Sequence, residues 1–423
     1  MRDDVGTAVV DRPVPALAGE RAGWRAVATM SAGTFAIGTD TFVMAGLVGD
    51  IALEWGITVG AAGMAVTAYS LSIAVGAPLL AAVLGGRPLR ALLVGSLSLF
   101  AAVELVAVLA SGWGAFLVAR VAAALPAAVY APAATAAAVA AVPDKQHGRA
   151  LAAMVGGASL AMTVGAPVGV LLAAASSWRA PFGLTAVLAA GAAMALLRCE
   201  SRSPALARTS VGERLRPLRS PELVGTLGVT LLTMAASSVL YTYLGVLVDG
   251  TVGTGGIGLV MAAFGIGGLV GTWCGGSVAD RWGSRASVLV ATVALAVVGP
   301  MISAADTVTA VALAVGWGVA SWGIVPAQQH RLLGLGPTVG PSPASVVPTR
   351  VLRINAAAEQ GGDPQVISLA LNSSAIHLGS ALGALLGGIV LDMGAADRLW
   401  WVSVVCCGAV PLLQNQITRK GRS

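Results

Sequence analysis

Three ionisable residues, Asp40, Glu104 and Arg120, interrupt long apolar stretches of this chain. A charge at the centre of a bilayer costs at least about 2.5 to 3.5 kcal/mol, and by default it marks an ion pathway or a proton site. Two carboxylates beside one cation can exchange a proton, because breaking the pair of Asp40 with Arg120 would favour protonation of the freed carboxylate. We predict a proton-coupling site with Asp40 as the principal carrier, Arg120 as its partner and Glu104 in reserve. The alternative is a fixed structural pair of Arg120 with Glu104.

The elements that must position these residues are twelve apolar stretches of roughly 18 to 25 residues, each long enough to cross a bilayer as a helix. The composition agrees, with 57% hydrophobic residues, 10% charged residues and a mean hydropathy of +0.85. The stretches lack the period-two alternation of a membrane β-barrel. We predict an all-α protein of the cell membrane, with spans at 26–47, 61–84, 91–110, 113–139, 150–173, 179–198, 222–247, 256–279, 286–304, 308–329, 365–390 and 397–416.

Positive charge sets the predicted orientation. Of the 25 Lys and Arg residues, all except Arg120, Arg179 and Arg398 lie in the tails, in every second gap between spans or, for Arg198, at the end of a span next to such a gap. Cytoplasmic loops carry this excess, so both termini are predicted to be cytoplasmic. At a helical rise of about 1.5 Å per residue, the three intramembrane ionisable residues share a depth of roughly 10 Å below the predicted outer end. The basic residues are dispersed and lack interleaved aromatic residues, which argues against nucleic-acid binding.

The chain repeats itself. Span 61–84 aligns with 256–279, and span 150–173 aligns with 365–390, so the sequence predicts two six-helix bundles. Their predicted bounds are 26–198 and 222–416, with tails at 1–25 and 417–423 and a cytoplasmic linker at 199–221. The second bundle carries a long Pro- and Gly-rich inner loop, 332–363, which we predict to be disordered. Parallel six-helix halves are the architecture of secondary transporters, where substrate binds near the midplane.

One inner loop carries a motif. Its residues Gly276, Asp280, Arg281, Gly283 and Arg285 resemble the loop signature of the major facilitator superfamily. Across about 26–416 the chain resembles that superfamily's twelve-span drug/proton antiporters. The resemblance implies a conformational latch at the inner surface, where Asp280 would cap a helix or pair with Arg281 or Arg285. The matching loop of the first half has Gly85 at the aspartate position, so any latch there is expected to be weaker.

Two further segments carry the resemblance. Small residues and a proline in the fifth span resemble the antiporter signature, which implies export: Gly156, Gly165, Pro167 and Gly169. Small residues let helices approach closely in lipid, and Pro167 removes a backbone hydrogen bond. Arg120 matches the arginine of the fourth-helix motif, and the segment around Asp40 resembles the chloramphenicol-efflux and sugar-efflux branches.

Substrate contacts from the second half are expected on spans seven and eleven, which face the cavity in the superfamily. The candidates are Tyr241, Tyr243, Asn372 and His377. A cavity poor in fixed charge suits a small apolar or zwitterionic drug, antibiotic or secondary metabolite. The resemblance implies a proton-coupled exporter that works by alternating access. Efflux of a sugar or an amino acid is an alternative. A transport-inactive receptor or assembly partner is another, because Thr41, Gly85 and Leu125-Pro126 depart from family motifs.

Other chemistry is not indicated. The sequence shows no nucleophile–base pair, no metal-ligand spacing and no phosphate-binding loop, so we predict neither an enzyme nor ATP-driven transport. We expect no cofactor and no metal. The predicted partners are a small-molecule substrate, protons and the lipid bilayer, and the predicted state is a monomer. The tryptophans near span boundaries are expected to form an interfacial belt: Trp113, Trp178, Trp400 and Trp401.

Overall fold

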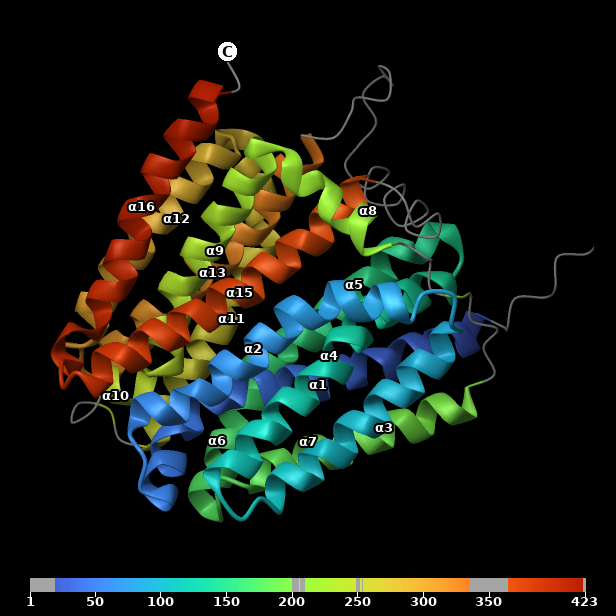
Figure 1. Ribbon diagram of the computed structural model, residues 1–423, viewed down its shortest axis with the longest axis horizontal. Helices are drawn as coiled ribbons and strands as arrows, with labels where there is room; N and C mark the ends of the chain where they lie inside the picture. The colour runs from blue at the N-terminus through green and yellow to red at the C-terminus, as the bar shows by residue number, and fades with distance from the viewer. Residues whose placement is uncertain are drawn as a thin grey trace, which may run out of the picture.

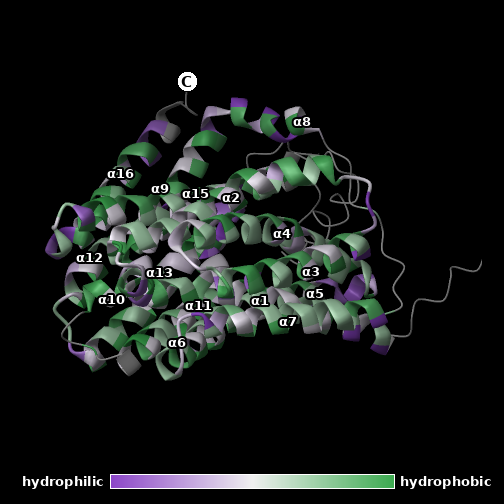
Figure 2. Cartoon of the chain, turned by 60° about the horizontal axis from the view of Figure 1, so that its bottom comes forward, coloured by the Kyte–Doolittle hydropathy of each residue, from purple (hydrophilic) through white to green (hydrophobic). Residues whose placement is uncertain are grey.

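The computed structural model describes residues 20–199, 205, 210–248, 252, 254–334 and 364–420. Every named element in these ranges is a helix, and twelve helical segments are long and apolar enough to cross a membrane. This confirms the all-α prediction. The helices form two groups that are inclined to each other, one from each half of the chain (Figure 1). Hydrophobic residues cover most of their length, while hydrophilic residues gather largely at helix ends and in connections (Figure 2).

The first half contains six spans. They are formed by α1 (Glu20–Trp55), α2 (Val59–Val83), α3 (Leu89–Val108), α4 (Trp113–Ala140), the series η1 (Asp144–Gln146), α5 (His147–Leu160), η2 (Ala161–Gly165) and α6 (Ala166–Ala175), and finally α7 (Ala180–Arg198). The lengths differ widely, from 36 residues in α1 to 19 in α7.

The second half contains the other six spans: α9 (Pro221–Thr242), α11 (Thr254–Trp282), α12 (Ser284–Ile302), α13 (Thr307–Gly334), α15 (Pro364–Asp392) and α16 (Leu399–Lys420). Short helices α10 (Leu244–Leu247) and η4 (Ala396–Arg398) lie between spans. The predicted loop 332–363 begins later than expected, because α13 continues to Gly334. The remainder of that loop lies outside the described residues.

The linker contains more helix than its composition suggests. Residues of the predicted cytoplasmic linker 199–221 form α8 (Val211–Leu215) and η3 (Arg216–Arg219). Ser210 caps α8, since its hydroxyl accepts a hydrogen bond from the Glu213 backbone N–H while the Glu213 carboxylate accepts one from the Ser210 backbone N–H. This reciprocal capping box holds the pKa of Glu213 below its usual range, chiefly through the Ser210 backbone N–H.

Two spans are interrupted. In the fifth span, the Ala166 N–H reaches back five residues to the Ala161 carbonyl, which makes η2 a π-helical turn immediately before Pro167. The proline has no N–H to continue the ordinary ladder. The seventh span ends at Thr242 rather than at the predicted residue 247, because Tyr243 leaves the helical conformation with φ −111° and ψ 27°. A single turn, α10, follows.

The two halves meet closely at the predicted outer end. There α2 packs against α15, and a Cβ on Gly60 would collide with the backbone of Gly388. A Cβ on Gly63 would collide with the ring of Tyr243. The hydrophobic cluster that includes Tyr243 also contains Met44 of the first half, so apolar packing is continuous between the halves.

Candidate substrate cavity and intramembrane ion triad

The three intramembrane ionisable residues meet inside the first half. Arg120 of α4 makes a two-pronged contact with Asp40 of α1, with Nη1 donating to Oδ1 at 2.6 Å and Nη2 donating to Oδ2 at 2.9 Å. Nη1 also donates to Glu104 Oε1 of α3 at 3.3 Å. The exposed fractions are 1% for the Arg120 side chain and 0% for both carboxylates. The arginine therefore pairs mainly with Asp40, across helices, and only secondarily with Glu104 inside the hairpin.

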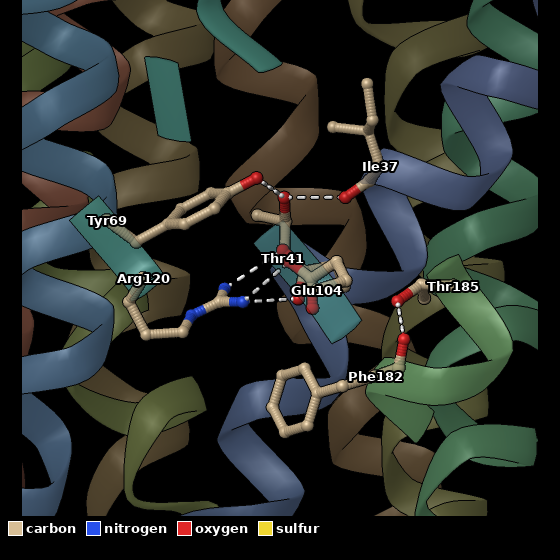
Figure 3. A network of polar contacts seen from close by, with 8 residues as sticks. Ile37, Thr41, Tyr69, Glu104, Arg120, Phe182 and Thr185 are labelled. Atoms are coloured by element: carbon tan, nitrogen blue, oxygen red, sulfur yellow. Dashed lines mark hydrogen bonds and ion pairs between the residues drawn. The ribbon is translucent and has the colours of Figure 1, made fainter. Parts of the chain in front are cut away.

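Aromatic rings hold the guanidinium in place (Figure 3). The Tyr69 ring centroid lies 4.4 Å from Arg120 Cζ, and the Phe182 ring centroid lies 5.3 Å from it. Such contacts stabilise a desolvated cation. The Tyr69 hydroxyl lies 3.4 Å from the Thr41 hydroxyl, which itself donates to the Ile37 carbonyl at 2.9 Å.

The charges of the triad do not balance. Two carboxylates face one guanidinium, so the cluster is neutral only when one carboxyl group holds a proton. Within the described part of the chain, Glu104 Oε2 and Arg120 Nε are buried atoms without a hydrogen-bond partner. Burying an unpaired charge is costly, which makes a cluster that can gain and lose one proton chemically reasonable at this position.

Arg120 also borders a cavity between the halves. The first half contributes Thr41, Phe42, Tyr69 and Arg120 to its wall. The second half contributes aromatic residues, hydroxyl groups and one imidazole: Tyr241, Phe264, Trp322, Ser237, Ser238, Thr242, Ser321, Ser380 and His377. Asp40 and Glu104 are not among the lining residues, so they lie behind Arg120.

Aromatic contacts join the two walls. The Phe42 ring centroid lies 6.1 Å from that of Tyr241 and 6.0 Å from that of Trp322, both in edge-on arrangements. The Tyr241 hydroxyl donates to the Phe42 carbonyl at 3.3 Å. These contacts connect the first half to the second half at the wall of the cavity.

Of the four expected substrate residues, the structure brings Tyr241 and His377 to the cavity and directs the other two elsewhere. The Tyr243 hydroxyl donates to the Ala384 carbonyl at 2.7 Å, and its side chain is buried between α2 and α15. Asn372 Oδ1 accepts a hydrogen bond from Thr230 at 2.8 Å, inside a buried polar network of the second half. Both side chains are engaged in helix packing.

The fifth-span motif lies where α1 meets the η2 turn. A Cβ on Gly165 would collide with the Thr39 side chain, and one on Gly169 would collide with Val43. Gly156 faces open space instead. Pro167 follows the π-helical turn in α6. Two of the three glycines thus permit the close approach expected from their size.

The loop signature occupies the end of α11 and the start of α12. Gly283 has φ +80°, a conformation that favours glycine, and it begins α12 without a side-chain cap. Asp280 does not cap that helix; its carboxylate lies 3.5 Å from His330 Nε2 of α13. Arg285 donates to Asn415 of α16. Gly276 and Arg281 lie in α11. These contacts of Asp280 and Arg285 stay within the second half.

Several cavity residues were not anticipated from the sequence, among them Phe42, Trp322 and the serines of α9 and α13. For Phe42, the only signal that could have indicated a cavity position is its direct succession to Asp40 and Thr41. Ser237 and Ser321 share a hydrogen bond at 2.7 Å across α9 and α13, which sequence spacing alone does not reveal.

The fold and this central cavity define a membrane transporter with two six-helix halves. The sequence profile of the Major Facilitator Superfamily matches residues 30–337. The chain belongs to that superfamily.

Relatives extend the comparison. A chloramphenicol resistance protein of Streptomyces lividans is 32% identical over 374 residues, covering 86% of this chain and 89% of that protein. The inner membrane transport protein YdhP of Escherichia coli K12 is 27% identical, covering 86% and 88%. A chloramphenicol efflux pump of Mycobacterium tuberculosis is 29% identical over 264 residues, covering 61% and 59%.

Solved structures share the fold at low sequence identity. The nucleoside transporter NupG superposes with a TM-score of 0.69 at 14% identity, covering 95% of this chain and 99% of that one. A bacterial homologue of the lysosomal transporter Spinster, in an inward-facing and occupied conformation, has a TM-score of 0.67 at 13% identity, covering 95% and 97%.

Proposed function

We propose that this chain is a proton-coupled exporter of a small apolar or zwitterionic molecule, with chloramphenicol-like antibiotics as the first class to test. The observation that carries the proposal is the buried triad of Asp40, Glu104 and Arg120, whose arginine borders the cavity between the halves. The relatives named for chloramphenicol resistance and efflux support the choice of substrate class.

The triad couples proton movement to the state of the cavity. When a proton reaches Asp40, the two-pronged pair with Arg120 is lost. Nη1 already contacts Glu104, so the guanidinium keeps an anionic partner while Asp40 is neutral. Because Arg120 lines the cavity, substrate entry there disturbs the same guanidinium that determines the charge of Asp40. Substrate and proton then occupy the transporter alternately.

The cavity chemistry fits the proposed cargo. Its aromatic side chains, including Tyr241 and Trp322, offer faces and edges to a ring-bearing molecule. Serine hydroxyls and His377 offer hydrogen bonds without a fixed charge. A strongly charged substrate would find only Arg120, which the carboxylates already neutralise.

Topology and partners complete the proposal. The excess of Lys and Arg in alternate connections supports cytoplasmic termini in a cell membrane. With α2 and α15 packed at the predicted outer end, we assign access to the cavity in this state to the inner side. The exported molecule, protons and lipid are its partners, and the transporter acts as a monomer.

The test is proton-driven uptake into inverted membrane vesicles, measured with labelled chloramphenicol and a pH-sensitive dye. Asp40→Asn keeps the side-chain shape but removes the titrating group, so substrate should still bind while uptake against a gradient disappears. Glu104→Gln should have the milder effect, because its single contact with Arg120 is the longest of the three. Asp50→Asn, at an exposed position on the same helix, is the matched control and should behave like wild type.

The results separate the alternatives. Accumulation by Asp40→Asn but not by Glu104→Gln would move the carrier to α3 and contradict our assignment. Proton movement with sugars or amino acids, and none with chloramphenicol, would favour the second substrate class. A wild-type chain that moves no protons with any compound of the panel would favour a receptor.

A further inference from the structure

Five aromatic residues fill the first half between the triad and the predicted outer end: Trp55, Trp113, Phe116, Trp178 and Phe182. We call them the aromatic plug. Phe116 lies one helical turn before Arg120 on α4, toward the outer end. Phe116 and Phe182 are 0% exposed and Trp178 is 4% exposed, so the inner part of the plug is closed to solvent. Trp178, which was predicted to belong to an interfacial belt, is buried among the rings of the plug.

The rings of the plug are packed in a continuous series. The Trp178 centroid lies 4.9 Å from that of Trp55 and 5.3 Å from that of Phe116. Phe116 in turn lies 5.5 Å from Phe182, whose ring contacts the Arg120 guanidinium. The indole N–H of Trp178 donates to Glu54 at the surface. Phenyl rings supply no hydrogen-bonding atoms, so the inner layer of Phe116 and Phe182 cannot pass a proton along a hydrogen-bonded chain.

A surface ion pair fastens the plug. Arg179 donates to both carboxylate oxygens of Glu54 and, at 3.3 Å, to the Ala110 carbonyl. Its guanidinium also lies 4.3 Å from the Trp178 ring centroid. These contacts join the end of α1 to the turns before α4 and α7. All of these residues belong to the first half, so the plug can stay closed while the two halves move relative to each other.

We infer that the aromatic plug is a proton seal: it blocks a direct path from the outer end to the triad, so that protons reach the triad through the central cavity. The inference rests on the proposed proton-coupling function. A carboxylate at roughly 10 Å depth needs such a barrier, because water reaching it from the outer side while the cavity opens inward would let protons cross without substrate. Phe182 and Tyr69 also act as positioning residues for Arg120.

The experiment is a substrate-free leak assay. The purified full chain is placed in liposomes with an imposed pH gradient, and the decay of the gradient is followed with an internal pH dye. Phe182→Ala leaves a space beside Arg120, where buried polar nitrogens can hold water. We expect the gradient to decay several-fold faster than with wild type, and Phe182→Leu to restore most of the barrier.

The matched control is Phe100→Ala. Phe100 is also 0% exposed, but it lies on α3 one turn to the inner side of Glu104. With Phe100→Ala, we expect the pH gradient to decay at the wild-type rate. Adding Asp40→Asn to Phe182→Ala should slow the proton leak, because the triad then has one fewer carboxylate that can bind and release the proton. A wild-type decay rate for Phe182→Ala, or an equal leak from Phe100→Ala, would overturn the seal.

A surface variant decides the matter if Phe182→Ala does not fold. Glu54→Gln weakens the ion pair with Arg179 without creating a cavity in the core, and we expect a smaller but measurable proton leak. A pH gradient that decays at the wild-type rate would contradict the inference. The assay contains no substrate, so it is separate from the test of coupling. A leaky Phe182→Ala together with uncoupled transport by wild type would overturn the proposed function and leave the seal standing.

Discussion

The two halves share a fold but place polarity differently. In the described chain, all buried charged side chains belong to the first half: Asp40, Glu104 and Arg120. The buried polar side chains of the second half are neutral, and they include Thr230, Gln328 and Asn372. Gln328 donates to the Thr226 carbonyl at 2.9 Å and to the Thr230 hydroxyl at 3.2 Å, which ties α13 to α9.

This difference separates two tasks within a duplicated architecture. In the proposed function, the ionisable residues of the first half hold the proton. The buried polar side chains of the other half form neutral hydrogen bonds, and aromatic rings from that half shape the cavity wall. Under that proposal, the first half supplies the proton site and the second half supplies most of the neutral cavity wall.

The largest effect is expected from a substitution in the buried charged triad of the first half. Arg120→Leu leaves two buried carboxylates without a cation, and removing one partner of a buried ion pair costs about 3 to 5 kcal/mol. We expect poor recovery of folded protein from membranes and a lower unfolding temperature in detergent. Arg120→Lys is the control that keeps the charge and should recover part of the stability. An Arg120→Leu protein as stable as wild type would show that both carboxyl groups take up protons, and so become neutral, once the arginine is removed.

A second prediction concerns the loop signature, which is complete only in the second half. Asp280→Asn should leave insertion and abundance intact but slow transport several-fold, because the resemblance to the loop signature implies that this carboxylate changes partners between transport states. Transport is measured in vesicles at equal membrane abundance. Asp397→Asn, at an exposed turn of the predicted outer side, is the control. Equal rates for Asp280→Asn and wild type would remove the latch from the mechanism.

A smaller effect is expected on the neutral side. Asn372→Leu removes the acceptor for Thr230, and hydrogen bonds between membrane helices contribute about 0.6 to 2 kcal/mol. The variant should unfold at a modestly lower temperature and keep its proton-to-substrate ratio unchanged. A changed ratio would give the second half a share in proton coupling and would weaken the division of tasks.

The smallest effect is expected from the inserted loop. Deleting residues 338–361 should preserve folded protein and transport, since the first half has no counterpart of this segment. Size-exclusion chromatography and vesicle transport of the deletion variant test this. Loss of folded protein would mean that the insertion packs on the helices of the second half.

Hydropathy and helical rise predicted the twelve spans and the shared depth of the triad, because both quantities depend on position along single helices. The pairing of Asp40 with Arg120 followed from that depth and from charge. Depth alone did not distinguish Asp40 from Glu104 as the partner of Arg120, since the two carboxylates lie on different helices whose rotation is set by packing.

The missed features depend on contacts between distant segments. Tyr243 leaves the cavity because the seventh span ends at Thr242, and a local break redirects its side chain toward Ala384. The partner of Asp280 is His330, fifty residues along the chain. The aromatic plug consists of rings from the end of α1, from α4 and from the region where α7 begins. No local sequence pattern indicates that these rings contact one another.

Because the helices differ in length, the thickness of the membrane can affect the balance between transport states. At about 1.5 Å per residue, α1 measures about 54 Å and α7 and α12 about 28 Å. The short α12 lies toward the edge of the bundle in Figure 1, beside α16. A hydrocarbon layer thicker than about 28 Å must thin around these short helices, at a fraction of a kcal/mol per ångström, and it disfavours any state that tilts them further. Lipid chain length can thus bias the balance between transport states without touching the cavity.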